Sequence, residues 1–537
     1  MGTDLTFSSR RSPVVCLHGC VASSQPLASS IGLDVLKRGG NAADAAVAIA
    51  AALVGNPLVL SLFFPMCAKI NRTSLCVLSG HSPRALTLDF LEGQGYTAER
   101  PPSVFDALNV TVPGAPACWC DTVQLLGSHK LSLQEVLSGA VELAEVGFPV
   151  AELTAHHWAN WVSALRDAGK ELGVELMIDG HAPKCGQVFQ NTGLARTLKE
   201  LGERGKPAFY QGRVAQAIVD VINQNGGVMT LGDLSSHDSE VITPISTEYK
   251  GVRLWELPPN SQGLAALLML NILENFPQLK AKGHNSSDYI HVLVEAVRLA
   301  LTDALRYLGD SSHVTIPLET LLDKGYSHQR AQLISTDRLE PGLMTGSDTV
   351  YFCVIDSERN ACSFVNSNYM GFGTGLVPKD CGFSLQNRGA NFSLCRNHIN
   401  CVAGRKRVYH TIIPALLTDS TTTSQKPRLL AALGVMGAFM QPQGHVQVLL
   451  NMMEFGMNPQ QALDAPRVYV EYDHKTQRVF ASSFSFTHTG HKRSQFGRGQ
   501  IIAVGDWWNP SVTQGDRPSR VLWAGSDPRA DGCAQGY

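Results

Sequence analysis

From Gly346 to Asp356 the chain reads Gly-Ser-Asp-Thr-Val-Tyr-Phe-Cys-Val-Ile-Asp. The β-branched and aromatic residues of this stretch predict a strand over Thr349–Ile355. The polar segment that follows predicts a turn, and Ala361–Val365 predicts the returning strand of a hairpin. From about residue 343 onward, strands, turns and glycine-rich loops dominate the sequence.

Helical patterns dominate before that point. Apolar residues recur with helical spacing in Gln25–Arg38, and Asn41 is placed to cap an alanine-rich helix. The most regular pattern covers Ile290–Leu308, with Ser286 or Ser287 as its cap. Val110–Val112 predicts a short strand. Helices mixed with antiparallel strands favour a layered α/β fold over a series of parallel βαβ units.

The composition excludes several classes of protein. The chain has 537 residues, of which 44% are hydrophobic and 17% charged, so it is neither disordered nor a coiled coil. A net charge of −2 gives no reason to expect nucleic-acid or membrane-surface binding. The uncharged run Ala45–Ala68 is long enough to span a bilayer, but Gly55-Asn56-Pro57 interrupts it. A buried helix followed by a buried strand is therefore favoured over a transmembrane helix.

The sequence contains no pattern typical of a metal or cofactor site. Its thirteen cysteines lack zinc-site spacing and are expected to be reduced thiols. Residues 1–15 lack the apolar segment of a secretory signal, so we expect a cytoplasmic protein. Motifs of the GxSxG, HExxH and P-loop types are absent. The glycines of Gly371–Gly375 are not followed by the helix that a dinucleotide site needs, so we expect neither a cofactor nor a metal.

Five motifs spread over the chain carry a family resemblance. They are Arg38-Gly-Gly-Asn-Ala-Ala-Asp-Ala-Ala46, Val112-Pro-Gly-Ala115, the stretch Gly346–Asp356, Leu385-Gln-Asn-Arg-Gly389 and Phe455-Gly-Met-Asn-Pro-Gln-Gln-Ala-Leu-Asp-Ala-Pro-Arg467. Together they resemble the gamma-glutamyltransferase (glutathione hydrolase) proenzyme family. Their exact form is closer to the soluble glutathione hydrolase-like and cephalosporin-acylase-like branch than to the membrane-anchored, secreted branch.

The resemblance implies an α/β layered fold, the αββα sandwich of the N-terminal nucleophile (Ntn) hydrolases. It also implies a chain that is cut between Asp348 and Thr349. The large segment, 1–348, and the small segment, 349–537, would stay together as one αββα domain. Thr349 matches the nucleophile of the family, although its residue type alone marks it only as part of a strand.

The chemistry of the family explains why the nucleophile must become a chain end. A threonine hydroxyl needs a base, and in this class the base is the residue's own α-amino group, with a pKa near 8. The Thr349 hydroxyl would first attack the carbonyl of Asp348 and form an ester that water hydrolyses. The freed Thr349 would then attack a substrate amide, form an acyl-enzyme and pass the acyl group to water or an acceptor amine.

The resemblance assigns further site residues. Ser367 matches the hydroxyl residue that hydrogen-bonds the new amino terminus, although a polar loop residue would look the same in the sequence. Gly437 and Ala438 match the Gly-Gly pair whose backbone N–H groups form the oxyanion hole, and alanine need not abolish it because only the backbone is used. The candidates for substrate binding are His81, Tyr369, Arg388, Asn391, His410 and Thr411.

The sequence departs from the family where the charged groups of the substrate bind. His81 replaces the arginine that grips the α-carboxylate, Asn391 replaces the aspartate that holds the α-ammonium, and His410-Thr411 replaces a pair of serines. Imidazoles of ordinary pKa would bind a carboxylate better at about pH 6 than at about pH 8. Alternatively, His81 is a solvated turn residue that does not face the substrate. Leu58–Met66 lacks the family's glycine-rich loop.

We therefore expect an autoprocessing Ntn amidohydrolase or acyltransferase. Its substrates would be γ-glutamyl amides, as in glutathione, or related dicarboxylic-acyl amides, cleaved through an acyl-threonine intermediate. The expected partners are this small-molecule substrate and the two fragments of the same chain, with no nucleic acid and no membrane. The departures at His81 and Leu58–Met66 leave an alternative, which is a catalytically weak or inactive family member that acts as a scaffold or binding protein.

Overall fold

Two antiparallel sheets lie against each other at the centre of the computed structural model. The model describes residues 11–54, 81–168, 173–334, 348–420, 427–473, 478–483, 496–509 and 520–537. The larger sheet consists, in spatial order, of β1 (Val14–Cys16), β14 (Leu522–Ser526), β13 (Arg498–Val504), β10 (Leu429–Met436), β9 (Ala415–Asp419), β6 (Val252–Glu256) and β5 (Ile245–Tyr249). The smaller sheet consists of β15 (Cys533–Gly536), β2 (Cys20–Ser23), β7 (Asp348–Ile355) and β8 (Ala361–Tyr369).

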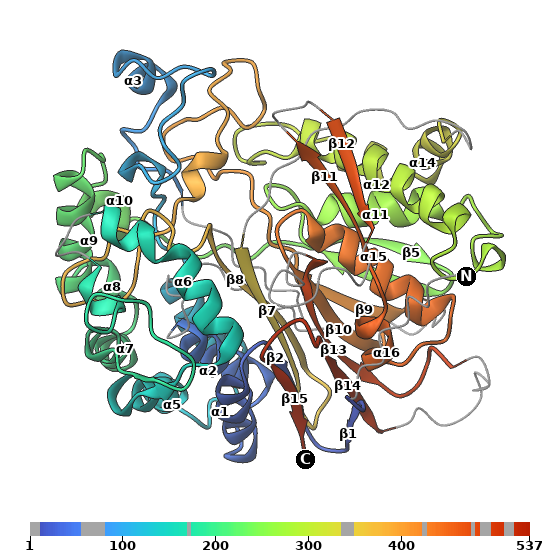
Figure 1. The fold of residues 1–537 in the computed structure, drawn as a ribbon, viewed down its shortest axis with the longest axis horizontal. Coiled ribbons are helices and arrows are strands. Elements are labelled where there is room, and N and C mark those ends of the chain that lie inside the picture. The colour runs from blue at the N-terminus through green and yellow to red at the C-terminus, as the bar shows by residue number, and fades with distance from the viewer. Residues whose placement is uncertain are drawn as a thin grey trace.

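Helices cover the outer face of each sheet, which gives the four layers of an αββα sandwich (Figure 1). The helices α1 and α2 pack on the smaller sheet, whereas α11, α15 and α16 pack on the larger one. The helices on the side of the smaller sheet are α1 (Pro26–Lys37), α2 (Ala42–Val54), α4 (Ala115–Leu126), α5 (Leu133–Val146), α6 (Glu152–Asp167), α7 (Thr192–Arg204), α8 (Lys206–Tyr210), α9 (Arg213–Gln224) and α10 (Leu231–Ser235). Those on the other side are α11 (Gly263–Leu273), α12 (Ser287–Tyr307), α13 (Leu318–Leu322), α14 (Lys324–Ala331), α15 (Met440–Met453) and α16 (Pro459–Asp464).

Smaller elements complete the fold. They are the helix α3 (Leu88–Gly93), the 3₁₀ turns η1 (Ala107–Asn109), η2 (Val174–Leu176), η3 (Lys280–Lys282) and η4 (Arg388–Asn391), and the two-stranded pairs β3 (Phe148–Pro149) with β4 (Val188–Phe189) and β11 (Val468–Asp473) with β12 (Arg478–Ser483). Segments before and after residue 348 contribute strands to both central sheets. The two parts of the chain therefore share one sandwich.

The local sequence signals locate most of these elements. The side chain of Asn41 accepts hydrogen bonds from the N–H groups of Ala43 and Asp44 at the start of α2, and Ser286 caps α12 as expected. The strand expected at Val110–Val112 is wrong. This segment is extended but joins no sheet, because the N–H of Val112 donates to the carbonyl of His81 instead. The strand expected after α2 lies outside the described residues.

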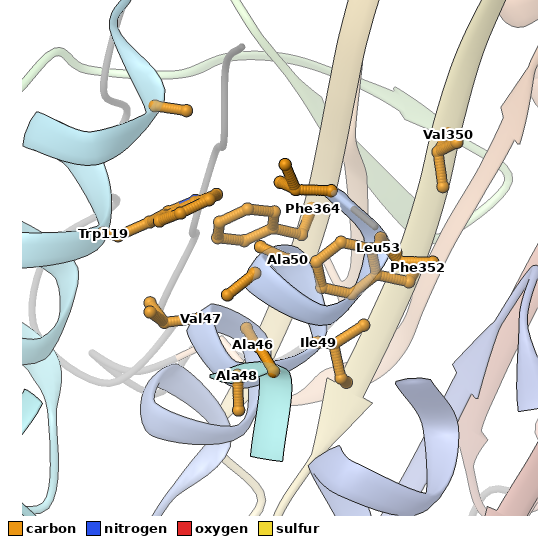
Figure 2. Packing of buried hydrophobic residues seen from close by; sticks show 14 of the residues in the cluster. Ala46, Val47, Ala48, Ile49, Ala50, Leu53, Trp119, Val350, Phe352 and Phe364 are labelled. Atoms are coloured by element: carbon orange, nitrogen blue, oxygen red, sulfur yellow. The ribbon is translucent and has the colours of Figure 1, made fainter. Parts of the chain in front are cut away.

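Small side chains let α2 approach the smaller sheet closely. Figure 2 shows alanines of α2 beside the rings of Phe352 and Phe364. Trp119 of α4 lies on the side of Phe364 that faces away from Phe352. The two phenylalanine rings stack with their centroids 4.8 Å apart. Burying such a ring contributes roughly 1.5–3 kcal/mol. This packing fixes the position of β7, the strand that begins at Asp348.

The contact between the two sheets gives a prediction about stability. A methyl group at Gly434 of β10 would lie 2.3 Å from Cε2 of Tyr351 on β7, whose hydroxyl is held by Ser363 at 2.8 Å. Because overpacking a core costs about 1–3 kcal/mol, Gly434→Ala should lower the free energy of unfolding by that amount. Urea or thermal unfolding measures the change. Gly93→Ala is the control, since nothing lies within 4 Å of the added methyl, and equal stability of both variants would contradict this packing.

Two further features bear on the sequence analysis. Within the described ranges, no helix combines the length and the apolar character needed to cross a membrane. Ten described cysteines carry free thiols, but Cys362 on β8 is disulfide-bonded, so the expectation of reduced thiols throughout is wrong at that position.

Candidate active site

Thr349 is the second residue of β7 and is fully buried. The pairing of β7 with β8 is irregular opposite Thr349. Asp348 pairs with Tyr369 and Val350 with Asn366, so β8 carries one more residue than β7 between these pairs. Such a bulge redirects side chains, and here it brings Ser367 of β8 to the Thr349 hydroxyl.

The Thr349 hydroxyl has a hydrogen-bond partner on each side. Its Oγ1 donates to Oγ of Ser367 at 3.4 Å and accepts from Nε2 of Gln441 at 3.4 Å. Ser367 Oγ also accepts from the N–H of Tyr369 at 3.1 Å and from Nη2 of Arg388 at 2.7 Å. A threonine, a serine and a guanidinium thus form one continuous hydrogen-bonded group.

Arg388 is fully buried and lies in η4. Its Nη1 donates to Oγ1 of Thr411 at 3.1 Å, and its guanidinium carbon lies 4.7 Å from the centre of the Tyr369 ring. The backbone of Tyr369 has a φ of +78°, an uncommon conformation for a residue of this size. Two hydroxyls and an aromatic face therefore hold the cation.

No carboxylate of the described residues forms an ion pair with Arg388. Arg467, which is also fully buried, is paired with the carboxylate of Asp527, whereas no ion pair of Arg388 is found among the described residues. Burial lowers the pKa of Arg388 to about 9, so the side chain is still protonated at neutral pH. A buried cation without an anion is costly, and an anionic ligand would remove that cost.

The loop that carries Arg388 is tied to segments distant in the sequence. Gln386 donates from Nε2 to the carbonyl and hydroxyl of Thr111 at 3.0 and 2.8 Å, and Asn387 donates to the carbonyl of Val104 at 2.8 Å. Gly373 has a φ of +62°, and a Cβ there would lie 2.2 Å from the carbonyl oxygen of Leu385. The glycine-rich loop expected around this position is therefore needed for close packing against the arginine loop.

Gly437 and Ala438 form the turn between β10 and α15, with φ angles of +125° and +52°. In the described part of the chain, the carbonyl oxygens of Gly437 and Ala438 accept hydrogen bonds. The donors are the backbone N–H groups of Met440 and Gln441 and the side chain of Gln262. Gln441, three residues further on, contacts Thr349. The two backbone N–H groups thus belong to a turn close to Thr349, and their role as an oxyanion hole stays a prediction.

His81 lies apart from this group. Its ring packs against that of His237, with 6.4 Å between the ring centres, and the charge of Arg407 acts on it. Burial, followed by the charge of Arg407, lowers the pKa of His81 to about 4. None of these contacts joins His81 to Thr349 or Arg388, so its role in substrate binding stays a prediction.

The remaining candidates surround Arg388 to different degrees. Thr411 bonds the guanidinium directly, and His410 is buried close enough for the charge of Arg388 to affect it. Burial, with a smaller contribution from Arg388, lowers the pKa of His410 well below its usual value. Asn391 is half-buried and donates from its amide to the carbonyl of Tyr409 at 3.3 Å.

Comparison with known proteins identifies the family. A family model described as gamma-glutamyltranspeptidase matches residues 28–537. The chain belongs to the gamma-glutamyltranspeptidase family. It is 35% identical to the glutathione hydrolase-like YwrD proenzyme of Bacillus subtilis, over 96% of this chain and 98% of that protein. It is 30% identical to the oxamate amidohydrolase proenzyme of Klebsiella pneumoniae, over 97% of this chain and 99% of that protein.

A solved structure agrees with this membership. The crystal structure of cephalosporin acylase from Bacillus halodurans matches with a TM-score of 0.86 and 36% identity, over 100% of this chain and 99% of that one. This gamma-glutamyltranspeptidase family member is therefore an enzyme with the αββα fold of the Ntn hydrolases. Leu58–Met66, where its sequence departs from the glycine-rich loop of the family, lies outside the described residues.

The pKa values of His81 and His410 in this gamma-glutamyltranspeptidase family member bear on one expectation. The expectation of an imidazole that titrates near neutrality is not supported, because burial lowers the pKa of His81 to about 4 and the pKa of His410 well below its usual value. For a substrate with a free carboxylate, we expect KM to change by less than about twofold between pH 6 and pH 8. If Thr349 becomes a chain end, kcat should fall toward low pH over the same range, because an α-amino group, with an ordinary pKa near 8, gains a proton. Steady-state kinetics across this range test both statements, and a KM that improves about tenfold at pH 6 would contradict the first.

Sequence reasoning missed two glutamines of this site. Gln441 donates to the Thr349 hydroxyl, and Gln262, also fully buried, donates to the carbonyls of Thr411 and Ala438. Gln441 lies in the first turn of α15, which begins at Met440. A buried glutamine leaves no periodic signal, and only the repeated glutamines of Gln441-Pro442-Gln443 were visible in the sequence.

Proposed function

We propose that this enzyme is an autoprocessing amidohydrolase whose substrate carries a free carboxylate on its acyl group. The observation that carries the proposal is the hydrogen-bonded chain from Thr349 through Ser367 to Arg388, a buried cation with no carboxylate among the described residues. The names of the relatives, a glutathione hydrolase-like protein, an oxamate amidohydrolase and a cephalosporin acylase, support acyl-group hydrolysis.

Maturation would use the same hydroxyl as catalysis. Oγ1 of Thr349 attacks the carbonyl carbon of Asp348, the C–N bond breaks, and the nitrogen takes up the proton released by the hydroxyl. Water then hydrolyses the resulting ester. The products are the segments 1–348 and 349–537, which remain together because both contribute strands to both sheets.

The catalytic cycle follows from the new amino terminus. The free amine of Thr349 accepts the hydroxyl proton while Oγ1 bonds to the substrate carbonyl carbon. The N–H groups of Gly437 and Ala438 stabilise the oxyanion, and the leaving amine departs with the proton. Water, or an acceptor amine, repeats the sequence on the acyl-enzyme. Ser367 holds the amine in place, and Arg388 holds Ser367.

Arg388 is the proposed receptor for the substrate carboxylate. Two hydrogen-bond lengths, 3.4 and 2.7 Å, separate the nucleophilic oxygen from Nη2 of Arg388. An acyl group that contacts both must be short, so the fitting substrates are amides of small dicarboxylic acids. Glutaryl and γ-glutamyl amides, the latter including glutathione, belong to this class.

The site offers little for an α-ammonium group. Asn391 stands where an aspartate would give Coulomb attraction, and its amide donates to the carbonyl of Tyr409. A charge-assisted hydrogen bond is worth about 1 kcal/mol more than a neutral one. We therefore expect the enzyme to prefer γ-glutamyl over glutaryl amides by less than about tenfold in kcat/KM. Side-by-side kinetics with γ-glutamyl p-nitroanilide and glutaryl p-nitroanilide measure this ratio. A hundredfold preference for the γ-glutamyl compound would contradict the expectation.

Two measurements test the function as a whole. Denaturing electrophoresis of the purified chain should show two fragments, with Thr349 at the amino terminus of the smaller one. Glutaryl p-nitroanilide should be hydrolysed at least about 100-fold better than pentanoyl p-nitroanilide, which has the same length but no carboxylate. An uncut chain that hydrolyses neither compound would favour the alternative of an inactive scaffold.

A further inference from the structure

We propose that Gln441 positions the Thr349 hydroxyl for both self-cleavage and substrate attack. Gln441 lies in the first turn of α15, directly after the turn formed by Gly437 and Ala438, and its side chain is buried. Its Nε2 donates to Oγ1 of Thr349 at 3.4 Å. The inference rests on the proposed function, because it assumes that Thr349 is the nucleophile.

The orientation of the Gln441 amide is fixed by the backbone. The N–H of Ile413 donates to its Oε1 at 3.3 Å, and an N–H can only approach the oxygen of an amide. The nitrogen must therefore be the atom that faces Thr349. Ile413 follows Thr411, which binds Arg388, so one backbone segment sets both the nucleophile and the proposed carboxylate receptor.

A donor at this place has a definite chemical consequence. Nε2 of Gln441 occupies a lone pair of the Thr349 oxygen, so the hydroxyl hydrogen must point elsewhere, toward Ser367 and the amine that Ser367 would hold. The hydroxyl is then arranged to lose its proton to the base as the new O–C bond forms. Gln441 carries no charge at any pH, so it orients the hydroxyl without acting as a base.

The same bond serves deacylation. When water cleaves the acyl-enzyme, the bond between the acyl carbon and Oγ1 of Thr349 breaks, and the oxygen regains a proton from the amine. A hydrogen bond from Gln441 stabilises the negative charge that develops on this oxygen. Because maturation and turnover break or form bonds at one atom, loss of the donor should slow both.

Gln441→Met is the first test, since methionine fills a similar volume without a donor. We expect self-cleavage and kcat for glutaryl p-nitroanilide to slow by about 10- to 30-fold each, with KM changed less than about twofold. Gln447→Met is the matched control. Gln447 is buried on the same helix, and its Oε1 likewise accepts a backbone N–H, from Val468 at 2.8 Å, but its contacts do not include Thr349.

The control separates positioning from packing. Gln447→Met should lose stability yet retain the self-cleavage rate and kcat of the wild type. If Gln441→Met fails to fold, Gln441→Glu is the second test. Glutamate keeps the shape of glutamine and the hydrogen bond from the N–H of Ile413, but it presents a carboxylate oxygen to Thr349. We expect it to slow both reactions at about pH 8. Wild-type rates in either folded Gln441 variant would overturn the inference. A wild-type chain that neither cuts itself nor hydrolyses the anilide would instead overturn the proposed function.

Discussion

Thr349→Ala is expected to leave the chain whole and without hydrolytic activity. The variant keeps the strand, because alanine fits any position that threonine occupies, but it removes the oxygen that we propose attacks both Asp348 and the substrate. Activity should fall by at least about 10⁴-fold, as for other nucleophiles that act as part of a unit. Electrophoresis follows the cut, and the anilide assay follows turnover.

Two variants show whether this result reflects the hydroxyl. Thr349→Ser retains an oxygen at the same place and should still cut itself and hydrolyse the anilide, at reduced rates. Thr418→Ala removes another fully buried threonine hydroxyl, which accepts from the indole of Trp255 at 2.9 Å, and should be cut normally. Recovery of Thr349→Ala cut before residue 349 would show that another protease acts on the chain.

Arg388→Met is expected to lower kcat/KM for glutaryl p-nitroanilide by about 10²- to 10³-fold. A guanidinium that binds a carboxylate through two charge-assisted bonds contributes several kcal/mol, and methionine contributes neither bond. For pentanoyl p-nitroanilide the loss should stay below about tenfold, because only the support of Ser367 disappears. The free energy of unfolding should stay the same or rise, since an uncompensated buried charge is removed.

The pair of substrates makes this prediction specific to the carboxylate. Arg388→Lys keeps the charge but not the planar fork, and it should fall between the wild type and Arg388→Met for the glutaryl compound. An equal loss for both anilides would mean that Arg388 only holds Ser367 in place. In that event the carboxylate, if it binds at all, would be recognised by another residue.

Local sequence determined a large part of this protein. The hairpin that starts at Thr349 and the caps at Asn41 and Ser286 form where the residues predict them, because a strand or a helix start depends on a few neighbouring residues. The motifs also identified the family and the αββα fold. Val110–Val112 shows the limit of such signals, since its residues suit a strand but the tertiary structure pairs it with the segment at His81.

Only the tertiary structure decided which of the candidate cations is charged at neutral pH. In the sequence, His81, His410 and Arg388 were all candidates for binding a carboxylate. Burial by residues from distant segments keeps both imidazoles neutral at neutral pH, whereas the guanidinium stays protonated despite full burial. The contact between Gln441 and Thr349 likewise joins α15 to β7, which lie far apart in the chain. The pKa of a side chain and its contacts depend on what surrounds it in space, and no local pattern of residues specifies those surroundings.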